Sequence, residues 1–374
     1  MTAGVFRLSL PARQETPVIF ASPHSGAAYL PDFLAQSVLN ALQIRSSEDA
    51  FVDSLLAEAP SHGAALLVAD VPRAYLDLNR APDELDPAVI EGITRAPHNP
   101  RVSSGLGVIP RVVSGGRAIY RGKLTRAEAE SRITRFWHPY HRALRDLIEA
   151  THGQFGQAIL IDCHSMPHEA LEHHSRPGRD LPDVVLGDRF GAAAAPWVMT
   201  AVETAFQTEG FRVSRNTPFA GAFIAQSYGR PSAGRHVVQV ELDRALYMDE
   251  GAIHPLPQFD ALAARLTEEA DAALVRAAAA ASASRSSFSC SYVQLSTFVR
   301  SITRFGIIAL GAVTYVGSGI SLGCHCARAS ADPLGSKVTP VSSRSAKGIQ
   351  LSGVVVRGEI TGERFVCETP SVRR

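Results

Sequence analysis

Ala158–Pro167 reads AILIDCHSMP, and the fold is best predicted from this stretch. One small and three aliphatic residues run without alternation into Asp162, Cys163 and His164. A continuous apolar run is typical of a strand that is covered on both faces, as in parallel sheets with helices on either side. Because open α/β sheets bind ligands beyond the carboxyl ends of their strands, we expect the chemistry to lie near His164.

A second strand ends in the same way. Val18–Ala21 is apolar, and Ser22, Pro23 and His24 follow it directly. The carboxyl ends of parallel strands meet at one edge of a sheet, so His24 and His164 should approach each other there. Two histidines at two strand ends suggest a metal site.

Strands and helices alternate through the first part of the chain. Apolar runs predict further strands at 64–69, 183–187, 211–214 and 235–242, and periodic patterns predict helices at 31–40, from 51 onward, at 125–151, before 209 and at 257–281. The predicted fold class is an α/β three-layer sandwich with a mixed, largely parallel sheet. Residues 81–122, rich in Gly, Pro and Arg, are predicted to form a long functional loop region.

Composition divides the chain into two parts. The 374 residues carry a formal charge of +1, which gives no overall attraction to nucleic acid, so we expect no nucleic-acid partner. Residues 286–374 hold 10 Lys/Arg and 4 Asp/Glu, whereas residues 1–285 hold 27 and 32. Cys163 is the single cysteine of the first part, and the N-terminus has no secretory pattern, so a reducing cytoplasm is expected.

A small set of side chains has the chemistry of a hydrolytic metal site. Such a site needs about three His or carboxylate ligands and a separate carboxylate that accepts a proton from water. His24, Asp49 and His164 could be the ligands, and Glu241, at the end of the strand at 235–242, could be the base. The alternative is that both histidines are polar residues satisfied at strand ends.

Other residues compete for attention. His173 with His174, and His138 with His141, are further histidine pairs, which we rank lower because of their exposed or core-facing contexts. Cys163 next to His164 is interpreted as a small buried residue, since neighbours in a strand point to opposite faces.

Three arginines in loops after strands are candidates for binding a substrate carboxylate, because the guanidinium fork matches a carboxylate with two hydrogen bonds. They are Arg73, Arg80 and Arg121. Solvation at the surface is the ordinary role of any one arginine, and Asn79-Arg80 is the stronger candidate because it follows an apolar segment.

Six motifs, taken in order, carry a resemblance to a known family. They are SPHSG at 22–26, Asp49 with Val52-Asp53, DLNR at 77–80, DCHSMP at 162–167, NTPFAG at 216–221, and QVEL at 239–242 with Leu246-Tyr247-Met248. Together they span about residues 17–281 and resemble the N-formylglutamate amidohydrolase family. The resemblance implies a phosphorylase/hydrolase-like α/β fold, distantly similar to zinc carboxypeptidases and aspartoacylases.

The resemblance also implies roles for individual residues. The metal ligands would be His24, Asp49 and His164, and the general base would be Glu241. A substrate carboxylate would be held by Asn79 and Arg80, with Arg121 and Asn216 contributing to substrate selection, and Arg73 would polarise the scissile carbonyl. Here Asp49 is chosen over Glu48 by its position in the motif, since no acid lies close to His24.

The implied reaction is metal-dependent hydrolysis of N-formyl-L-glutamate, or a similar N-acyl amino acid, to formate and glutamate. One divalent ion, Zn²⁺ by the resemblance, would activate a water and Glu241 would take its proton. The family's role implies histidine degradation. The alternatives are a deacylase or carboxypeptidase acting on another N-acyl amino acid or small peptide, and a non-catalytic binding protein of the same fold.

The resemblance does not extend to residues 286–374, which we treat as a C-terminal extension to an amidohydrolase domain at 1–285. Phe305–Gly323 is a 19-residue uncharged run, long enough to span a bilayer of about 30 Å. Three interpretations compete: a membrane anchor, a small strand-rich appendage, and a poorly structured extension that is foreign to the family. The third is favoured, and the oligomeric state is not predicted.

Overall fold

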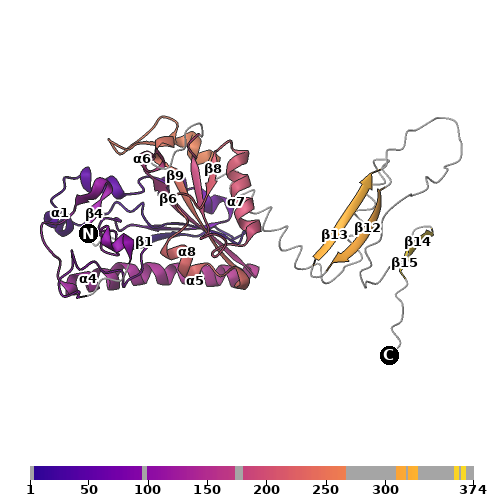
Figure 1. Cartoon of the computed structure of the whole chain (residues 1–374), viewed down its shortest axis with the longest axis horizontal. Helices are drawn as coiled ribbons and strands as arrows, with labels where there is room; N and C mark the ends of the chain where they lie inside the picture. The colour runs from indigo at the N-terminus through magenta and orange to yellow at the C-terminus, as the bar shows by residue number, and fades with distance from the viewer. Residues whose placement is uncertain are drawn as a thin grey trace, which may run out of the picture. The chain divides into compact units, whose positions relative to one another are not determined.

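The structure, a computed structural model, describes residues 4–94, 99–172 and 180–266 in full, and the backbone of four later strands. The chain divides into two compact units, Met1–Ser286 and Ser287–Arg374. Each unit is described by itself. Figure 1 shows the elements of both.

A seven-stranded sheet forms the centre of the first unit, in the order β1-β3-β2-β6-β9-β7-β8. Its members are β1 (Phe6–Ser9), β2 (Val18–Ser22), β3 (Ala65–Ala69), β6 (Ala158–Met166), β7 (Val184–Gly187), β8 (Val213–Arg215) and β9 (Arg235–Asp243). The four central strands, β3, β2, β6 and β9, are parallel. Strand β1 pairs antiparallel with β3 and β7 pairs antiparallel with β9, whereas β8 is parallel to β7. The predicted mixed, largely parallel sheet is therefore confirmed. The edge strand β1 was not predicted, because most of its residues are exposed and carry no strong apolar pattern.

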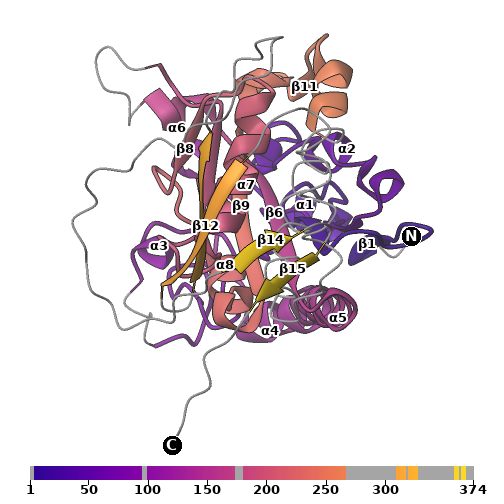
Figure 2. The same ribbon diagram turned by 90° about the vertical axis from the view of Figure 1, so that its right-hand side faces the viewer.

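Helices cover both faces of the sheet (Figure 1). One face packs against α4 (Arg126–Arg132), the π-helical turn η4 (Ile133–Trp137), α5 (His138–Phe155) and α8 (Phe223–Tyr228). The other packs against α2 (Val52–Leu55), α7 (Pro196–Thr208) and a helical stretch at 259–266. Figure 2 shows β1 between α2 and α5. This arrangement is the predicted three-layer sandwich.

Alternation along β6 supplies both cores. Ile159, Ile161 and Cys163 pack into the α7 side, whereas Ala158 and Leu160 pack into the α5 side. Successive side chains of a strand point to opposite faces, so a strand covered on both faces needs apolar residues at every position. Cys163 is buried as a small core residue, as predicted.

The predicted helix over 125–151 is confirmed and continues through η4 to Phe155. Its start is the predicted N-cap, since Thr125 Oγ1 accepts a hydrogen bond from the Glu128 N–H at 3.1 Å. It ends at Gly156, whose φ of 69° is a left-handed conformation that glycine adopts without strain.

Two other helix predictions were too long. The helix predicted over 31–40 is α1 (Pro31–Gln36), and the one predicted from 51 onward is the four-residue α2, preceded by Phe51 with a left-handed φ of 66°. Asp49 therefore lies before an irregular turn and not at the start of a long helix. Of the helix predicted over 257–281, residues 259–266 are helical and the rest lie outside the described residues.

The connections contain shorter elements. They are η1 (Gln43–Ser47), η2 (Ala59–His62), α3 (Pro100–Ser103), β4 (Val112–Val113), η3 (Ser114–Gly116), β5 (Arg117–Ala118), α6 (His168–Glu172), η5 (Pro231–Ala233), η6 (Arg244–Leu246), β10 (Met248–Asp249) and β11 (His254–Pro255). In the described part of 81–122 only α3, η3 and the short β4–β5 pair are regular, which agrees with the predicted long loop region.

In the second unit the backbone of two hairpins is described. Strand β12 (Ala309–Val316) pairs antiparallel with β13 (Gly319–Cys326), and β14 (Gly358–Thr361) pairs antiparallel with β15 (Arg364–Cys367). Among the residues that the structure describes, no helix is long and apolar enough to cross a membrane. The domain boundary at 285/286 and the character of residues 286–374 remain predictions.

Candidate metal and active site

The pairing of β6 with β9 brings four polar side chains together. In their parallel register His164 lies beside Glu241, and Asp162 lies beside Gln239. All four residues are buried, on the face of the sheet opposite to Cys163. The apolar run of β6 thus ends in a buried polar cluster at its carboxyl end.

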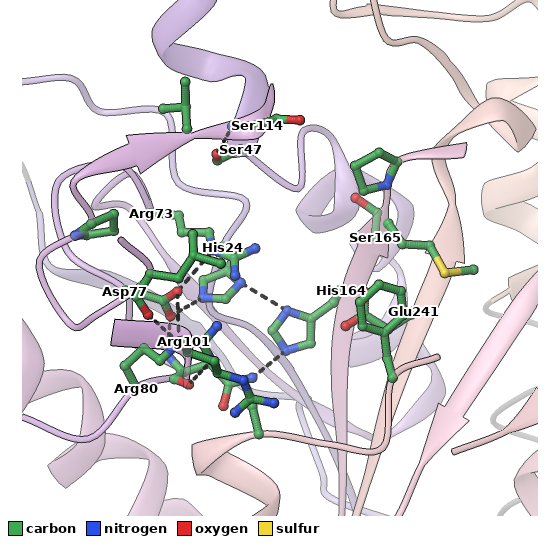
Figure 3. A pocket seen from close by; sticks show the side chains of 18 of the residues that line it. His24, Ser47, Arg73, Asp77, Arg80, Arg101, Ser114, His164, Ser165 and Glu241 are labelled. Carbon is green, nitrogen blue, oxygen red and sulfur yellow. Dashed lines mark hydrogen bonds and ion pairs between the residues drawn. The ribbon is translucent and has the colours of Figure 1, made fainter. Parts of the chain in front are cut away.

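The two predicted histidines meet at this edge of the sheet (Figure 3). His164 Nδ1 lies 3.1 Å from His24 Nδ1 and 3.1 Å from Asp49 Oδ2. His24 Nδ1 lies 3.5 Å from the same carboxylate oxygen. One possible ligand atom from each of the three residues lies within 4.8 Å of the others. Among the described residues, these three form the group of His, Cys, Asp or Glu side chains that could hold a metal ion.

The outer nitrogen of each histidine ring faces a carboxylate. His24 Nε2 lies 2.7 Å from Asp77 Oδ1, and His164 Nε2 lies 3.1 Å from Asp162 Oδ2. A carboxylate beside Nε2 favours the tautomer that carries the proton on Nε2, and in this tautomer Nδ1 of the neutral imidazole is the nitrogen that can bind a metal ion. The two Nδ1 atoms lie 3.1 Å apart, and carboxylate-supported histidines are typical of metal sites. The residues therefore fit a divalent metal ion of the zinc type.

Asp49 is fully buried and is held from its other side by Arg244. Arg244 Nη2 donates to Asp49 Oδ1 at 3.1 Å, its Nε donates to Ser165 Oγ at 3.1 Å, and its Nη1 donates to the Ser46 carbonyl at 3.2 Å. Burial alone raises the pKa of Asp49, but the close contacts with His164 and His24 outweigh it and hold that pKa well below its ordinary value. Asp49 is therefore an anion with Oδ2 directed at the two histidines.

Glu241 is buried beside this group. Gln239 Nε2 donates to Glu241 Oε1 at 2.8 Å, and burial raises the pKa of Glu241 to about 7, against the opposing charge of His164. A carboxyl group with a pKa close to neutrality can both accept and donate a proton at physiological pH. This is the protonation behaviour that a general base needs.

The predicted residues of the 73–80 segment lie in the same cluster. Arg73 Nε donates to Asp77 Oδ2 at 3.0 Å, so one carboxylate joins Arg73 to His24. The Asn79 side chain bridges two strands, because Nδ2 lies 3.2 Å from His164 Nε2 and 3.3 Å from Gln239 Oε1. Its Oδ1 accepts the Ile224 N–H at 2.8 Å, which secures the start of α8.

A cavity of about 580 Å³ opens over the cluster. Its lining includes six of the sequence-predicted residues: His24, Arg73, Asn79, Arg80, His164 and Glu241. Figure 3 shows Ser47 and Ser114 on one side of this pocket and Arg80 with Arg101 on another. Its volume suits a small molecule of amino acid size.

Two predicted substrate residues have other surroundings. Arg121 is exposed, and the cavity lining does not include it. The Asn216 amide is engaged with its own neighbourhood: Nδ2 donates to Asp188 Oδ1 at 2.9 Å and Oδ1 accepts the Asp188 N–H at 3.1 Å. Contact of either residue with substrate remains a prediction without support from this geometry.

The competing histidines are accounted for in part. His141 is buried on α5, with Nε2 donating to the Leu78 carbonyl at 2.8 Å, so it secures the chain next to Asn79. His173 and His174 lie outside the described residues.

Sequence reasoning missed Asp77, Asp162, Gln239 and Arg244 as members of the site. One signal was available for Asp162 and Gln239, since each lies two residues before a predicted site residue and therefore on the same face of its strand. Nothing in the sequence pairs Asp77 with His24 or Arg244 with Asp49, because these contacts join segments 53 and 195 residues apart.

The fold and the site together define an α/β sandwich with a candidate metal centre at the carboxyl ends of its strands. The sequence profile of the N-formylglutamate amidohydrolase family matches residues 16–248, and the chain belongs to this family.

Named relatives agree with this assignment. N-formylglutamate deformylase of Pseudomonas aeruginosa is 32% identical over 244 residues, covering 64% of this chain and 85% of the relative. The enzyme of the same name from Pseudomonas putida is 28% identical, over 63% of this chain and 82% of the relative.

Solved structures show the same fold. The crystal structure of an N-formylglutamate amidohydrolase from Ralstonia eutropha JMP134 has 36% identity and a TM-score of 0.67, covering 73% of this chain and 96% of that one. A protein from Agrobacterium tumefaciens with 17% identity and a TM-score of 0.50 shares the fold alone.

Proposed function

We propose that this protein is a metal-dependent amidohydrolase that cleaves N-formyl-L-glutamate to formate and L-glutamate. The observation that carries the proposal is the convergence of His24 Nδ1, His164 Nδ1 and Asp49 Oδ2 beside a cavity whose lining includes both histidines and Glu241. The names of the relatives in Pseudomonas and Ralstonia support the substrate.

His24, Asp49 and His164 would hold one divalent ion, which we propose to be Zn²⁺. When bound, it supplies Lewis acidity to water and to the scissile carbonyl. The carboxylates of Asp77 and Asp162 orient the two imidazoles through their Nε2 atoms.

Glu241 would act as general base and then as general acid. As a carboxylate it takes a proton from the attacking water, and as a carboxylic acid it returns that proton to the departing amine nitrogen. A pKa of about 7 permits both steps near neutral pH. Arg73, fixed by Asp77, would donate to the carbonyl oxygen as negative charge develops there.

Arg80 would bind a substrate carboxylate. Its Nε and Nη1 donate to the carbonyls of Leu106 and Asn79 at 2.9 Å each, which fixes the guanidinium plane at the cavity wall. Asn79, next to Arg80, would stabilise this wall of the cavity through its side-chain contacts with His164 and Gln239. We further propose that the enzyme works in a reducing cytoplasm, in keeping with the single cysteine of residues 1–285, and in histidine degradation.

Release of formate from N-formyl-L-glutamate by the purified protein tests the proposal. Activity should vanish with a chelator and return with Zn²⁺, and Glu241→Gln should keep the metal yet lose about three orders of magnitude in kcat. Near-normal turnover by Glu241→Gln contradicts the role of that residue. A metal-loaded protein inactive on this substrate but active on other N-acyl amino acids contradicts the substrate and keeps the reaction class.

A further inference from the structure

The charges that line the cavity are not balanced. Of its four arginines, Arg73 and Arg244 each pair with a buried aspartate, Asp77 and Asp49, at 3.0 and 3.1 Å. Arg80 Nε lies 3.9 Å from Asp77, a carboxylate already engaged by Arg73 and His24. Within the described residues, the Arg101 guanidinium has neither an ion pair nor a hydrogen bond.

Arg101 is held close to Arg80 by its backbone. The Leu106 carbonyl accepts Arg80 Nε at 2.9 Å, and the Leu106 N–H donates to the Arg101 carbonyl at 2.8 Å. Leu106 therefore connects the short helix α3 to the Arg80 guanidinium through these two hydrogen bonds.

A second anchor lies on the other side of α3. Asn99 Oδ1 accepts the Arg101 N–H at 2.9 Å, and Asn99 Nδ2 donates to Glu84 Oε2 at 2.7 Å. Glu84 Oε1 in turn accepts the Ala81 N–H at 2.9 Å, directly after Arg80. The position of Arg101 relative to Arg80 is thus determined by the fold, although its side chain is exposed.

The two guanidinium groups influence each other. Burial lowers the pKa of Arg80, and the positive charges of Arg73 and Arg101 lower it further. Two like charges in one cavity wall are unfavourable unless an anion lies between them. Figure 3 shows Arg80 and Arg101 on the same side of the pocket, away from Ser47 and Ser114.

We propose that Arg101 is a specificity-determining residue that, beside Arg80, binds the side-chain carboxylate of an N-acyl amino diacid. Arg80 adjoins Asn79 and hence the histidines, so it serves the carboxylate nearer the scissile amide, and Arg101 serves the distal one. This inference rests on the proposed function and adds to it the residue that recognises the distal carboxylate of the substrate.

The test compares N-formyl-L-glutamate with N-formyl-L-glutamine, which has the same shape without the distal charge. Arg101→Gln should lower kcat/KM for the glutamate substrate about 10- to 100-fold, chiefly through KM, because a charge-assisted hydrogen bond to bound substrate is lost. The loss should be confined to that substrate. Arg101→Lys keeps the charge without the guanidinium fork, so its kcat/KM for N-formyl-L-glutamate should lie between those of the wild type and Arg101→Gln.

Arg126→Gln is the matched control, because Arg126 is exposed on α4, pairs with Glu130 and does not line the cavity. This variant should leave kcat/KM unchanged for both substrates. An equal loss on both substrates for Arg101→Gln, or no loss on either, overturns the role of Arg101 and leaves the proposed function standing.

A wild-type protein that hydrolyses neither substrate contradicts the proposed function instead. The inference is then decided by calorimetric binding of N-formyl-L-glutamate to the metal-loaded wild type and to Arg101→Gln. Weaker binding by the variant supports it, and equal affinity or no binding overturns it.

Discussion

At the scale of single residues, Arg244 is the group on which the candidate site depends most. It joins the segment before Asp49, Asp49 itself and the residue after His164 through three hydrogen bonds. Removing one partner of a buried ion pair leaves the other charge without compensation in a low-dielectric interior. The cost should therefore exceed that of losing any surface ion pair of this protein.

Arg244→Gln should lower the free energy of unfolding by about 3 kcal/mol, because Asp49 loses its counter-charge. Urea denaturation in the presence of a chelator measures this without a contribution from bound metal. Arg212→Gln breaks an exposed pair with Asp183 and should cost less than about 1 kcal/mol. Equal losses in the two variants would show that Arg244 does not hold Asp49.

At the scale of elements, the helix formed by α4, η4 and α5 fixes the segment that carries Asn79 and Arg80. Trp137 Nε1, in the π-helical turn, donates to the Arg80 carbonyl at 2.9 Å, and His141 Nε2 donates to the Leu78 carbonyl at 2.8 Å. A π-turn inserts an extra residue and so redirects the side chains that follow it. Here it allows one helix to reach two carbonyls on either side of Asn79.

The stability of the protein should depend on pH through His141. Burial lowers the pKa of His141 to about 3, from 6.5 in an unfolded chain. Between those values only the unfolded chain binds the proton, so the free energy of unfolding should fall as the pH drops from 6.5 toward 3, by about 5 kcal/mol in full. Urea midpoints at several pH values for wild type and His141→Gln would measure this, and the variant should show the shallower dependence. Parallel pH profiles would contradict the assignment.

The loop that carries His24 packs closely on the chain that leaves β3. A Cβ on Gly26 would lie 2.3 Å from the Val71 carbonyl oxygen and 2.6 Å from the Asp70 carbonyl carbon, both backbone atoms. Any side chain at residue 26 must therefore separate the His24 loop from the segment of Arg73 and Asp77.

Gly26→Ala should lower the free energy of unfolding by about 1–3 kcal/mol through this overlap, and should weaken Zn²⁺ binding as His24 moves. Gly153→Ala is the control, since a Cβ there meets nothing within 4 Å and lies inside α5, where Ala should stabilise by about 0.5–1 kcal/mol. Thermal melts with and without Zn²⁺ would separate the two effects. A Gly26→Ala protein as stable as the wild type would contradict the close approach.

At the scale of the whole molecule, the first unit has a hydrophobic core of its own. Every buried apolar residue that the structure describes lies between Val18 and Leu266. The sheet order and the cavity likewise use residues of this range. The first unit has the core that an independent domain requires.

A chain ending at Ser286 should fold and keep the activity of the full chain. Its melting temperature should lie within a few degrees of that of the full-length protein, as measured by circular dichroism. A chain ending at Tyr228 lacks β9 and Glu241 and should not fold cooperatively, because β9 is a central strand of the sheet. Failure of the 1–286 chain would show that residues 287–374 contribute to the fold.

The sequence by itself determined most strands of the sheet and the long helix, since these follow from local pattern, and its resemblance to a known family supplied the candidate ligands. Continuous apolar runs indicate buried strands directly. The motifs that contain His24, Asp49, His164 and Glu241 can be recognised in order from the sequence alone. The edge strand β1 was not predictable in this way, because most of its residues are exposed and have no strong apolar pattern. The irregular turn at Phe51 was not predictable either, because the apolar spacing that follows it indicates a longer helix than the four residues that form.

Only the tertiary structure decided how the ligands are supported and which arginines reach the cavity. The pairs His24–Asp77 and Asp49–Arg244 join distant segments through loop packing, and no local pattern encodes such contacts. Arg73, Arg80 and Arg121 all lie in predicted loops after strands, yet Arg121 lies outside the cavity lining and the unpredicted Arg101 lies within it. The reason is physical: hydrophobic periodicity fixes which face of an element is buried, whereas the path of a loop depends on what it packs against.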